Sequence, residues 1–338
     1  MRSKALTYDD ILLIPQFSDI RSRNEVSLKS ELGDKNQLTL PIISSPMDTV
    51  TESTMAIAMC QAGGAGIIHR YNSIKEQAAH VHTAHTAGAY NVGAAIGVGG
   101  DFKERARAMF DAGASIICID IAHGHHVLMK EALTALKNIF GNNIHLMAGN
   151  VATLRGLNDL SDWGADSVKC NIGGGSICST RTQTGHGYPG LQTIIDCAKT
   201  DRDVKIIADG GIRTSGDVVK ALAVGADFVM LGSLLAGTNE SPGEKVDTPS
   251  GLKKKYRGMA SKDAQMEWRS RFSSNEGIST LIDCKGPVEI VLRDIDNGIR
   301  SGLSYSGCRS ISELQTRCQL ARQTSAGAQE GKAHILAK

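Results

Sequence analysis

The fold is decided by residues 204–233, VKIIADGGIRTSGDVVKALAVGADFVMLGS. The two ends of this stretch, 204–209 and 228–233, are short apolar runs that contain Ile or Val, which is typical of parallel strands buried on both faces. The middle, 214–226, starts on a Ser/Asp capping signal and ends at Gly225, which predicts a helix. The stretch therefore predicts a strand–helix–strand unit.

The same unit recurs along the chain. A second example of the helical part is FKERARAMFDAGA (102–114), which is amphipathic and ends at Gly113. Eight such units in series predict a closed (β/α)8 barrel, an α/β TIM barrel, with an open doubly wound sheet as the alternative. The eight apolar runs are LPIISS (40–45), AGIIHR (65–70), NVGAAIG (91–97), SIICID (115–120), HLMAGN (145–150), SVKCNI (167–172), VKIIAD (204–209) and FVMLGS (228–233).

The chain is interpreted as one barrel domain over residues 1–338, with additions outside the eight units. Residues 1–39 form a polar arm, and residues 322–338 are predicted to be a flexible tail. Residues 234–300 follow the last strand and are polar, which favours an active-site flap. Within this segment KKKYR (253–257) is predicted to be a solvated strip with Tyr256 pointing inward.

Composition and charge exclude several classes of protein. The net charge of +2 gives no electrostatic case for nucleic acid or an anionic membrane. No apolar run approaches the roughly 20 residues that span a bilayer, and the N-terminus lacks a secretory core. The 8 cysteines form no C-x-x-C pair, so we expect neither a zinc ribbon nor a redox pair, and a cytoplasmic location.

The active site of such a barrel lies at the carboxyl ends of the strands, where polar and glycine residues gather in this sequence. The richest of these segments is GGGSICSTR (173–181). Its backbone N–H groups can cradle a phosphate, and its carbonyls can ligate a monovalent cation. Cys178 is then either a nucleophile or an incidental cysteine in a phosphate loop, and loop chemistry alone leaves both open.

Two further strand ends predict a phosphate and ribose site. Asp209-Gly210-Gly211 and Gly232-Ser233 follow the seventh and eighth strands, whose loops often bind phosphate in barrels. Asp209 is expected to hold a ribose hydroxyl pair, with helix capping as the alternative.

The histidines and the glycine pattern favour neither a metal centre nor a Rossmann site. HGHH (123–126) lacks an obvious third ligand, so a cofactor-facing or supporting role is favoured over metal binding. His80, His82 and His85 are expected on a solvated helix face. No G-x-G-x-x-G opens a helix after a first strand.

Blocks at nearly every strand end resemble the IMP dehydrogenase/GMP reductase family, over almost the whole chain. They are LTYDDILL (6–13), SSPMDTVTE (44–52), GGGSICSTR (173–181), IADGGIR (207–213), VMLGSLLAGTNESPGE (229–244) and KYRGMAS (255–261). The dehydrogenase branch usually carries CBS modules after the second unit and an Arg-Tyr pair on a long flap that activates water. This chain has no CBS insertion, its flap is short, and no Arg-x-x-Tyr follows Glu276-Gly277. RTQTGHGYPG (181–190) is also more similar to the reductase version, so the resemblance implies the reductase branch.

The resemblance implies NADPH-dependent conversion of GMP to IMP and ammonia through a Cys178 adduct at purine C2, in a homotetramer. It assigns catalysis to Cys178, Thr180 and Glu276. It assigns the purine nucleotide monophosphate to Ser176, Asp209, Gly211, Gly232, Ser233, Tyr256, Gly258, Met259, Ser261 and Gly277. It assigns the cofactor to Asp120, His123, Ser179 and Thr180, and K+ to the carbonyls of Gly173, Gly175 and Cys178.

Some positions depart from the reductase pattern. Ser273-Ser274-Asn275 precede Glu276, Cys284 stands where Tyr is usual before Lys-Gly, and His123 is found more often in dehydrogenases. Three alternatives follow: an NAD-dependent IMP dehydrogenase without CBS modules, a reductase for a modified or deoxy purine nucleotide, and a catalytically silent barrel that binds nucleotides for regulation.

Overall fold

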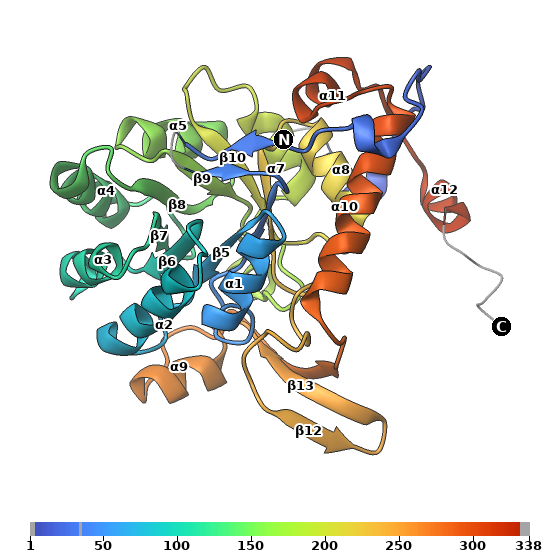
Figure 1. Cartoon of the computed structure of the whole chain (residues 1–338). Helices are drawn as coiled ribbons and strands as arrows, with labels where there is room; N and C mark the ends of the chain where they lie inside the picture. Colours follow the sequence, from blue (N-terminus) through green and yellow to red (C-terminus); the bar gives the residue numbers. More distant parts are fainter. Residues whose placement is uncertain (1–3, 34–35, 332–338) are drawn as a thin grey trace.

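The computed structural model describes residues 4–33 and 36–331 and contains a closed barrel of parallel strands in the order β10-β11-β4-β5-β6-β7-β8-β9 (Figure 1). Each of the eight apolar runs contains one barrel strand, which confirms the predicted TIM barrel. The barrel strands are β4 (Ile42–Ser44), β5 (Ala65–Ile68), β6 (Val92–Ile96), β7 (Ile116–Asp120), β8 (His145–Val151), β9 (Ser167–Cys170), β10 (Lys205–Asp209) and β11 (Phe228–Leu231).

Helices lie between successive strands, and most of them form the outer ring. They are α1 (Ser53–Gln61), α2 (Ile74–Thr86), α3 (Phe102–Asp111), α4 (Val127–Phe140), α5 (Leu154–Asp162), α6 (Thr180–Thr184), α7 (Gly190–Cys197) and α8 (Ser215–Ala223). The long α10 (Val288–Tyr305) packs against α8 and α1 and closes the ring after β11. The CBS modules expected of dehydrogenases have no counterpart, because residues 69–91 run from β5 through α2 directly to β6.

Local sequence explains where these helices begin and end. Thr214 caps α8 by accepting a hydrogen bond from the N–H of Asp217, as the capping signal predicts. Gly113 and Gly225 follow α3 and α8 with φ angles of +103° and +113°, a conformation that favours glycine. These helix ends set where the next strand enters the barrel.

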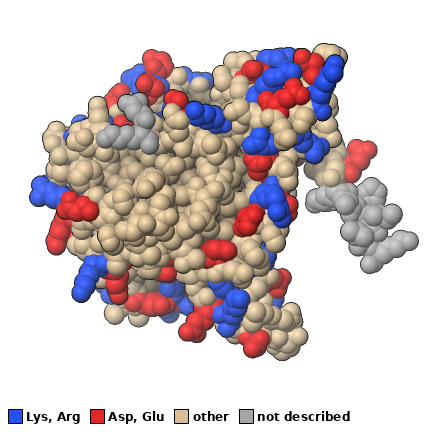
Figure 2. All heavy atoms as spheres, viewed as in Figure 1, with Lys and Arg blue, Asp and Glu red and all other residues tan. Residues whose placement is uncertain are grey.

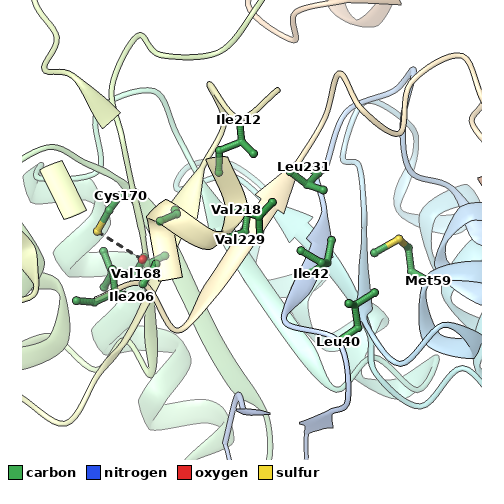
Figure 3. Packing of buried hydrophobic residues seen from close by; sticks show 14 of the residues in the cluster. Leu40, Ile42, Met59, Val168, Cys170, Ile206, Ile212, Val218, Val229 and Leu231 are labelled. Carbon is green, nitrogen blue, oxygen red and sulfur yellow. Dashed lines mark hydrogen bonds between the residues drawn. The ribbon is translucent and has the colours of Figure 1, made fainter. Parts of the chain in front are cut away.

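Two apolar clusters build the core. One fills the inside of the barrel and includes Ile43, Ile67, Ile207 and Phe228. The other lies between the strands and the helices and includes Val168, Ile206, Val229 and Leu231 of the barrel strands and Val218 of α8 (Figure 3). Because both faces of each strand are buried, the strand ends are held rigidly, which suits a site that needs fixed geometry.

The polar arm is more ordered than a featureless extension. It contains the turns η1 (Tyr8–Asp10) and η2 (Arg23–Glu25) and the strands β1 (Ile11–Leu13), β2 (Ser30–Glu31) and β3 (Gln37–Leu38). Leu32 and Leu38, beside the β2–β3 pair, are fully buried and join the cluster inside the barrel, so the arm plugs its amino end.

The segment predicted to be a flexible tail, from about residue 322, has regular secondary structure up to residue 330. After α11 (Ile311–Arg317), β15 (Leu320–Arg322) pairs with β1, and α12 (Ser325–Glu330) follows. The N–H of Gln323 also donates to the carbonyl of Asp10 at 2.9 Å. Backbone pairing with the arm supplies the order that the polar composition does not predict. Residues 332–338 lie outside the described part of the chain.

The segment after β11 forms a small antiparallel sheet of β12 (Lys245–Thr248), β13 (Gly251–Arg257) and β14 (Ser279–Asp283), with α9 (Lys262–Arg269) between the last two (Figure 1). The prediction that 253–257 is a solvated strip is wrong for Lys254, which is 3% exposed, and for Arg257. The Lys254 ammonium donates to the carbonyls of Thr238 and Ser241 at 3.0 and 2.6 Å, so its burial is compensated.

Both signs of charge are scattered around the rim of the face in Figure 2, whose centre is largely uncharged. No single-sign field covers this face. Among the described residues, no helix is long and apolar enough to cross a membrane.

Candidate active site

A cavity of about 450 Å³ opens at the carboxyl ends of the barrel strands. Its walls come from the ends of β4, β7, β9, β10 and β11 and from the flap. Fourteen of the predicted site residues line it: Asp120, Gly173, Gly175, Ser176, Cys178, Thr180, Asp209, Gly211, Gly232, Ser233, Tyr256, Gly258, Met259 and Glu276. The chain thus brings most of the predicted set to one place.

The loop after β9 presents Cys178 to this cavity. The N–H of Cys178 donates to the carbonyl of Gly175 at 3.1 Å, which closes a tight turn. Cys178 is exposed, and its Sγ atom lies 3.2 Å from Oγ1 of Thr180 at the start of α6. The other cysteines are buried or half-buried, so Cys178 is the thiol best placed to attack a ligand in the cavity.

The flap meets the cysteine loop through its backbone. The N–H of Ser179 donates to the carbonyl of Glu276 at 3.0 Å, and Cys178 forms a bridge with Gly277. The Glu276 carboxylate accepts a hydrogen bond of 2.7 Å from Ser274. A carboxylate on the flap and a hydroxyl beside the thiol therefore face the same cavity, an arrangement suited to proton transfer.

Backbone and hydroxyl groups form a cradle at one end of the cavity. The hydroxyls of Ser176 and Tyr256 lie 3.4 Å apart, although one follows β9 and the other ends β13. Burial raises the pKa of Tyr256, so its hydroxyl stays protonated and able to donate. A Cβ atom on Gly211 would lie 2.8 Å from the carbonyl of Gly174, so only glycine fits where these loops touch. The cradle has the donors that a phosphate requires.

Three barrel strands meet at a buried lysine that also lines the cavity. Lys169 of β9 is 2% exposed, and its ammonium pairs with Asp120 of β7 and, at 3.3 Å, with Asp209 of β10. Burial alone would lower the pKa of Lys169, but the two carboxylates outweigh it and raise the pKa above its usual value. Asn150 also donates to Asp209 at 2.8 Å. Asp209 is thus held by side chains rather than capping a helix, the role that Thr214 takes for α8.

The loop after β7 forms a rigid shelf next to Asp120. The N–H of Ile121 donates to the carbonyl of Gly149 in β8 at 3.0 Å, and its carbonyl accepts from the N–H of Asn150 at 2.9 Å. The N–H of Gly124 donates to the carbonyl of Asn150 at 2.7 Å. The cavity continues over this shelf past Ala122 and Arg70. The cavity therefore extends beyond the cradle, along the loop that follows β7.

Four predicted residues do not line the cavity. Ser179 and Gly277 lie at the contact between the flap and the cysteine loop, and Ser261 is buried as the cap of α9. His123 is exposed on the loop after β7. Among the described residues, no group of three or more His, Cys, Asp or Glu could hold a metal ion. His125 instead pairs with Asp159 at 2.7 Å.

The sequence interpretation missed several residues that line the cavity or anchor the flap. Arg257 of β13 pairs with Asp48, which follows β4, and with Glu267 of α9, so one buried guanidinium ties the flap to the barrel. Other cavity-lining residues that it did not single out are Arg70, Tyr71, Lys169, Asn171, Gln265 and Arg269. For Lys169 a signal was present, because a lysine inside a buried parallel strand must find charged partners.

Comparison with known proteins gives one consistent family. The IMP dehydrogenase / GMP reductase domain family matches residues 5–334. The chain is 32% identical to GMP reductase of Leishmania major, covering 99% of the chain and 98% of that protein. It is 37% identical to inosine-5'-monophosphate dehydrogenase of Cryptosporidium parvum, covering 98% and 95%.

The alignment with the Leishmania protein spans 480 residues, more than the 338 of this chain, so the relative carries inserted residues that this chain lacks. Among solved structures, GMP reductase C318A from Trypanosoma brucei in complex with guanosine 5'-monophosphate has a TM-score of 0.93 and 31% identity, covering 98% of each chain. The chain therefore belongs to the IMP dehydrogenase/GMP reductase family of purine nucleotide oxidoreductases.

Proposed function

We propose that the chain reduces GMP to IMP with NADPH and releases ammonia. The observation that carries the proposal is the contact between the cysteine loop and a short flap, where Ser179 holds the carbonyl of Glu276 at 3.0 Å. After Gly277 the chain enters β14 within two residues, and no Arg-x-x-Tyr follows. A flap without that pair is poorly equipped to activate water against a covalent intermediate, so the intermediate is left for reduction.

In this proposal GMP lies with its phosphate in the cradle of Ser176, Gly211, Gly232, Ser233 and Tyr256. Asp209 holds the ribose hydroxyls, because its carboxylate is fixed by Asn150 and Lys169. Gly258, Met259 and Ser261, with Gly277, lie around the start of α9, where they support the base. Binding in this orientation brings purine C2 to the Cys178 thiol.

The covalent step forms a C–S bond between Cys178 and purine C2 and breaks the bond between C2 and the amino nitrogen. The amine needs a proton to leave as ammonia, and Thr180, beside the thiol, and Glu276, which lines the same cavity, are the groups that can relay it. NADPH, when bound over the shelf formed by Asp120 and the loop of His123, supplies a hydride to C2. The C–S bond then breaks, and the thiolate of Cys178 is regenerated.

A monovalent cation belongs to the proposal as a support of the cysteine loop. The carbonyls of Gly173, Gly175 and Cys178 belong to one short loop, residues 173–178, and carbonyl oxygens are the ligands that K+ takes. Turnover is therefore expected to rise when K+ replaces a bulky organic cation at constant ionic strength. A homotetramer, the assembly implied by the resemblance, is checked by light scattering.

Absorbance at 340 nm tests the reaction. Loss of absorbance with GMP and NADPH, together with ammonia release, supports the reductase. A gain with IMP and NAD and no loss with GMP contradicts it. Comparing GMP with dGMP tests the modified or deoxy alternative, and an absence of turnover with every purine nucleotide favours the silent nucleotide-binding barrel.

One observation favours the dehydrogenase as the second candidate. Arg269 and Tyr71 both line the cavity, so a guanidinium and a phenol are present there even though the sequence spacing of an Arg-Tyr pair is missing. The Tyr71 hydroxyl donates to the carbonyl of Met259 at 2.8 Å, and Arg269 is bound to Gln265 and Ser273. These partners occupy both side chains, which is why the reductase is preferred.

A further inference from the structure

We infer that Lys169 is a positioning residue that couples the ribose side of the site to the cofactor side. Its single ammonium bridges Asp209 and Asp120, and the inference rests on the proposed function for the roles of these two carboxylates. Lys169 lies inside β9, whereas the two aspartates end β10 and β7. One cation therefore joins three of the eight strands at the floor of the cavity.

The packing around Lys169 leaves little freedom to its stem. Lys169 is opposite Gly149 in β8 and opposite Ile207 in β10. A Cβ atom on Gly149 would lie 2.6 Å from Cβ of Lys169, so glycine at this position of β8 leaves the space that the Lys169 side chain occupies. The ammonium is thereby placed at a fixed depth, and the aspartates must adjust to it.

The lysine and the two aspartates depend on one another for charge compensation. The Asp120 and Asp209 side chains are 27% and 17% exposed, and each faces the cavity, whereas Lys169 is 2% exposed. Without the cation, two carboxylates would face each other across a partly buried space and repel. Asp209 would lose one of the two side chains that orient it, and only Asn150 would remain.

This arrangement has a functional consequence that a purely structural ion pair lacks. A ligand that moves the Asp209 carboxylate weakens or strengthens its ion pair with the Lys169 ammonium. The ion pair between that ammonium and Asp120 then changes as well. Nucleotide and cofactor sites are therefore linked through one charge, and neutralising Asp120 should compensate for loss of Lys169 at the nucleotide site only.

The experiment compares Lys169→Met, Lys169→Arg and the double variant Lys169→Met/Asp120→Asn by calorimetric titration with GMP in the absence of NADPH. Lys169→Met is expected to weaken GMP binding at least about tenfold, because an uncompensated carboxylate pair remains. The double variant is expected to recover GMP affinity to within roughly threefold of the wild type, while kcat stays low because Asp120 has been changed. Lys169→Arg keeps the positive charge, and its GMP affinity is expected to lie between those of Lys169→Met and the double variant.

Lys205→Met is the matched control, because Lys205 begins the neighbouring strand β10 and is 4.0 Å from Asp227, away from the cavity. It should bind GMP as the wild type does. Unchanged GMP binding in Lys169→Met, or a double variant no better than the single one, overturns the inference. If Lys169→Met does not fold, as judged by circular dichroism, Lys169→Arg is compared with Lys169→Arg/Asp120→Asn instead. Wild-type GMP affinity in both of these variants overturns the inference.

Failure of the proposed function would give a different experimental result from failure of the Lys169 bridge. A wild type that binds GMP but does not oxidise NADPH with it contradicts the reductase reaction, whereas the order of GMP affinities among the variants still tests the bridge. Conversely, normal reductase activity in Lys169→Met contradicts the bridge and leaves the reaction intact.

Discussion

The Sγ atom of Cys178 lies 3.2 Å from Oγ1 of Thr180, and both atoms face the same cavity. The pair forms because the loop after β9 turns back at Gly175 and α6 begins at Thr180. A hydroxyl at this distance can exchange a proton with the thiol or with an amine leaving from an adduct. The relationship thus connects the local turn to the proposed chemistry.

Replacing Thr180 by Val removes this hydroxyl without changing the size of the side chain. We expect kcat for GMP to fall by roughly 10²–10⁴-fold, the usual worth of a general acid–base group. The KM for GMP should change little, because the cradle is untouched. Stopped-flow and steady-state absorbance at 340 nm measure both, and Thr180→Ser, which keeps the hydroxyl, should retain most of the activity. Equal losses in the Val and Ser variants would exclude a proton-transfer role.

Gly210 and Gly211 offer a matched pair for the phosphate cradle. Both have positive φ angles, +81° and +76°, so alanine at either position costs about 1–2 kcal/mol of backbone strain. Both face the cysteine loop, but only a Cβ on Gly211 would clash with it, 2.8 Å from the carbonyl of Gly174. A Cβ on Gly210 would make an ordinary contact, 3.5 Å from Cα of Gly175.

We therefore expect Gly211→Ala to raise the KM for GMP at least about tenfold by shifting the loop of Ser176. Gly210→Ala should lose a similar amount of stability with a smaller change in KM. Steady-state kinetics and urea unfolding separate the two effects. If both variants raise the KM equally, backbone strain rather than the loop contact governs the cradle.

Arg257 is expected to hold the flap on the barrel. Its side chain is 9% exposed and pairs with the Asp48 side chain, which is 8% exposed. Arg257→Met would leave the buried Asp48 carboxylate uncompensated, and we expect a loss of about 3–5 kcal/mol of stability, with reduced kcat because Glu276 is no longer presented. Urea unfolding and turnover measure these effects.

Lys255→Met is the control for Arg257, because Lys255 is 45% exposed and lies 4.0 Å from Glu267. An exposed pair of this kind contributes at most about 1 kcal/mol. Equal stability losses in the two variants would show that the buried pair with Asp48 adds nothing.

The sequence predicted the barrel well because every buried parallel strand leaves a nearly continuous apolar run, and helix-capping signals separate the runs. It predicted that Cys178, Asp209 and Ser233 share one site, because the carboxyl ends of the strands in a barrel meet at the same face. The roles of Lys169 and Arg257 were not predicted, because they depend on which strands are neighbours in space. The partners Asp120, Lys169 and Asp209, for example, are far apart in the sequence. The strand β15 was not predicted for the same reason, since it forms by pairing with β1.

His145, at the amino end of β8, predicts a pH dependence of stability that is independent of catalysis. Its ring is buried and accepts or donates a 2.8 Å hydrogen bond with Ser167, and burial lowers its pKa to about 4. An unfolded histidine titrates near 6.5. Between these pH values His145 binds a proton in the unfolded chain but not in the folded one. The free energy of unfolding should therefore decrease as the pH falls from about 6.5 to about 4.

The size of this contribution is roughly 3 kcal/mol over the whole window. It is measured as the difference in pH dependence between the wild type and His145→Gln, by urea unfolding at pH 7 and pH 5. The variant should lose less stability over this interval than the wild type does. His82→Gln, on the exposed face of α2, should behave as the wild type does. An identical pH dependence in wild type and His145→Gln would mean that His145 remains neutral in both states or becomes solvated before the chain unfolds.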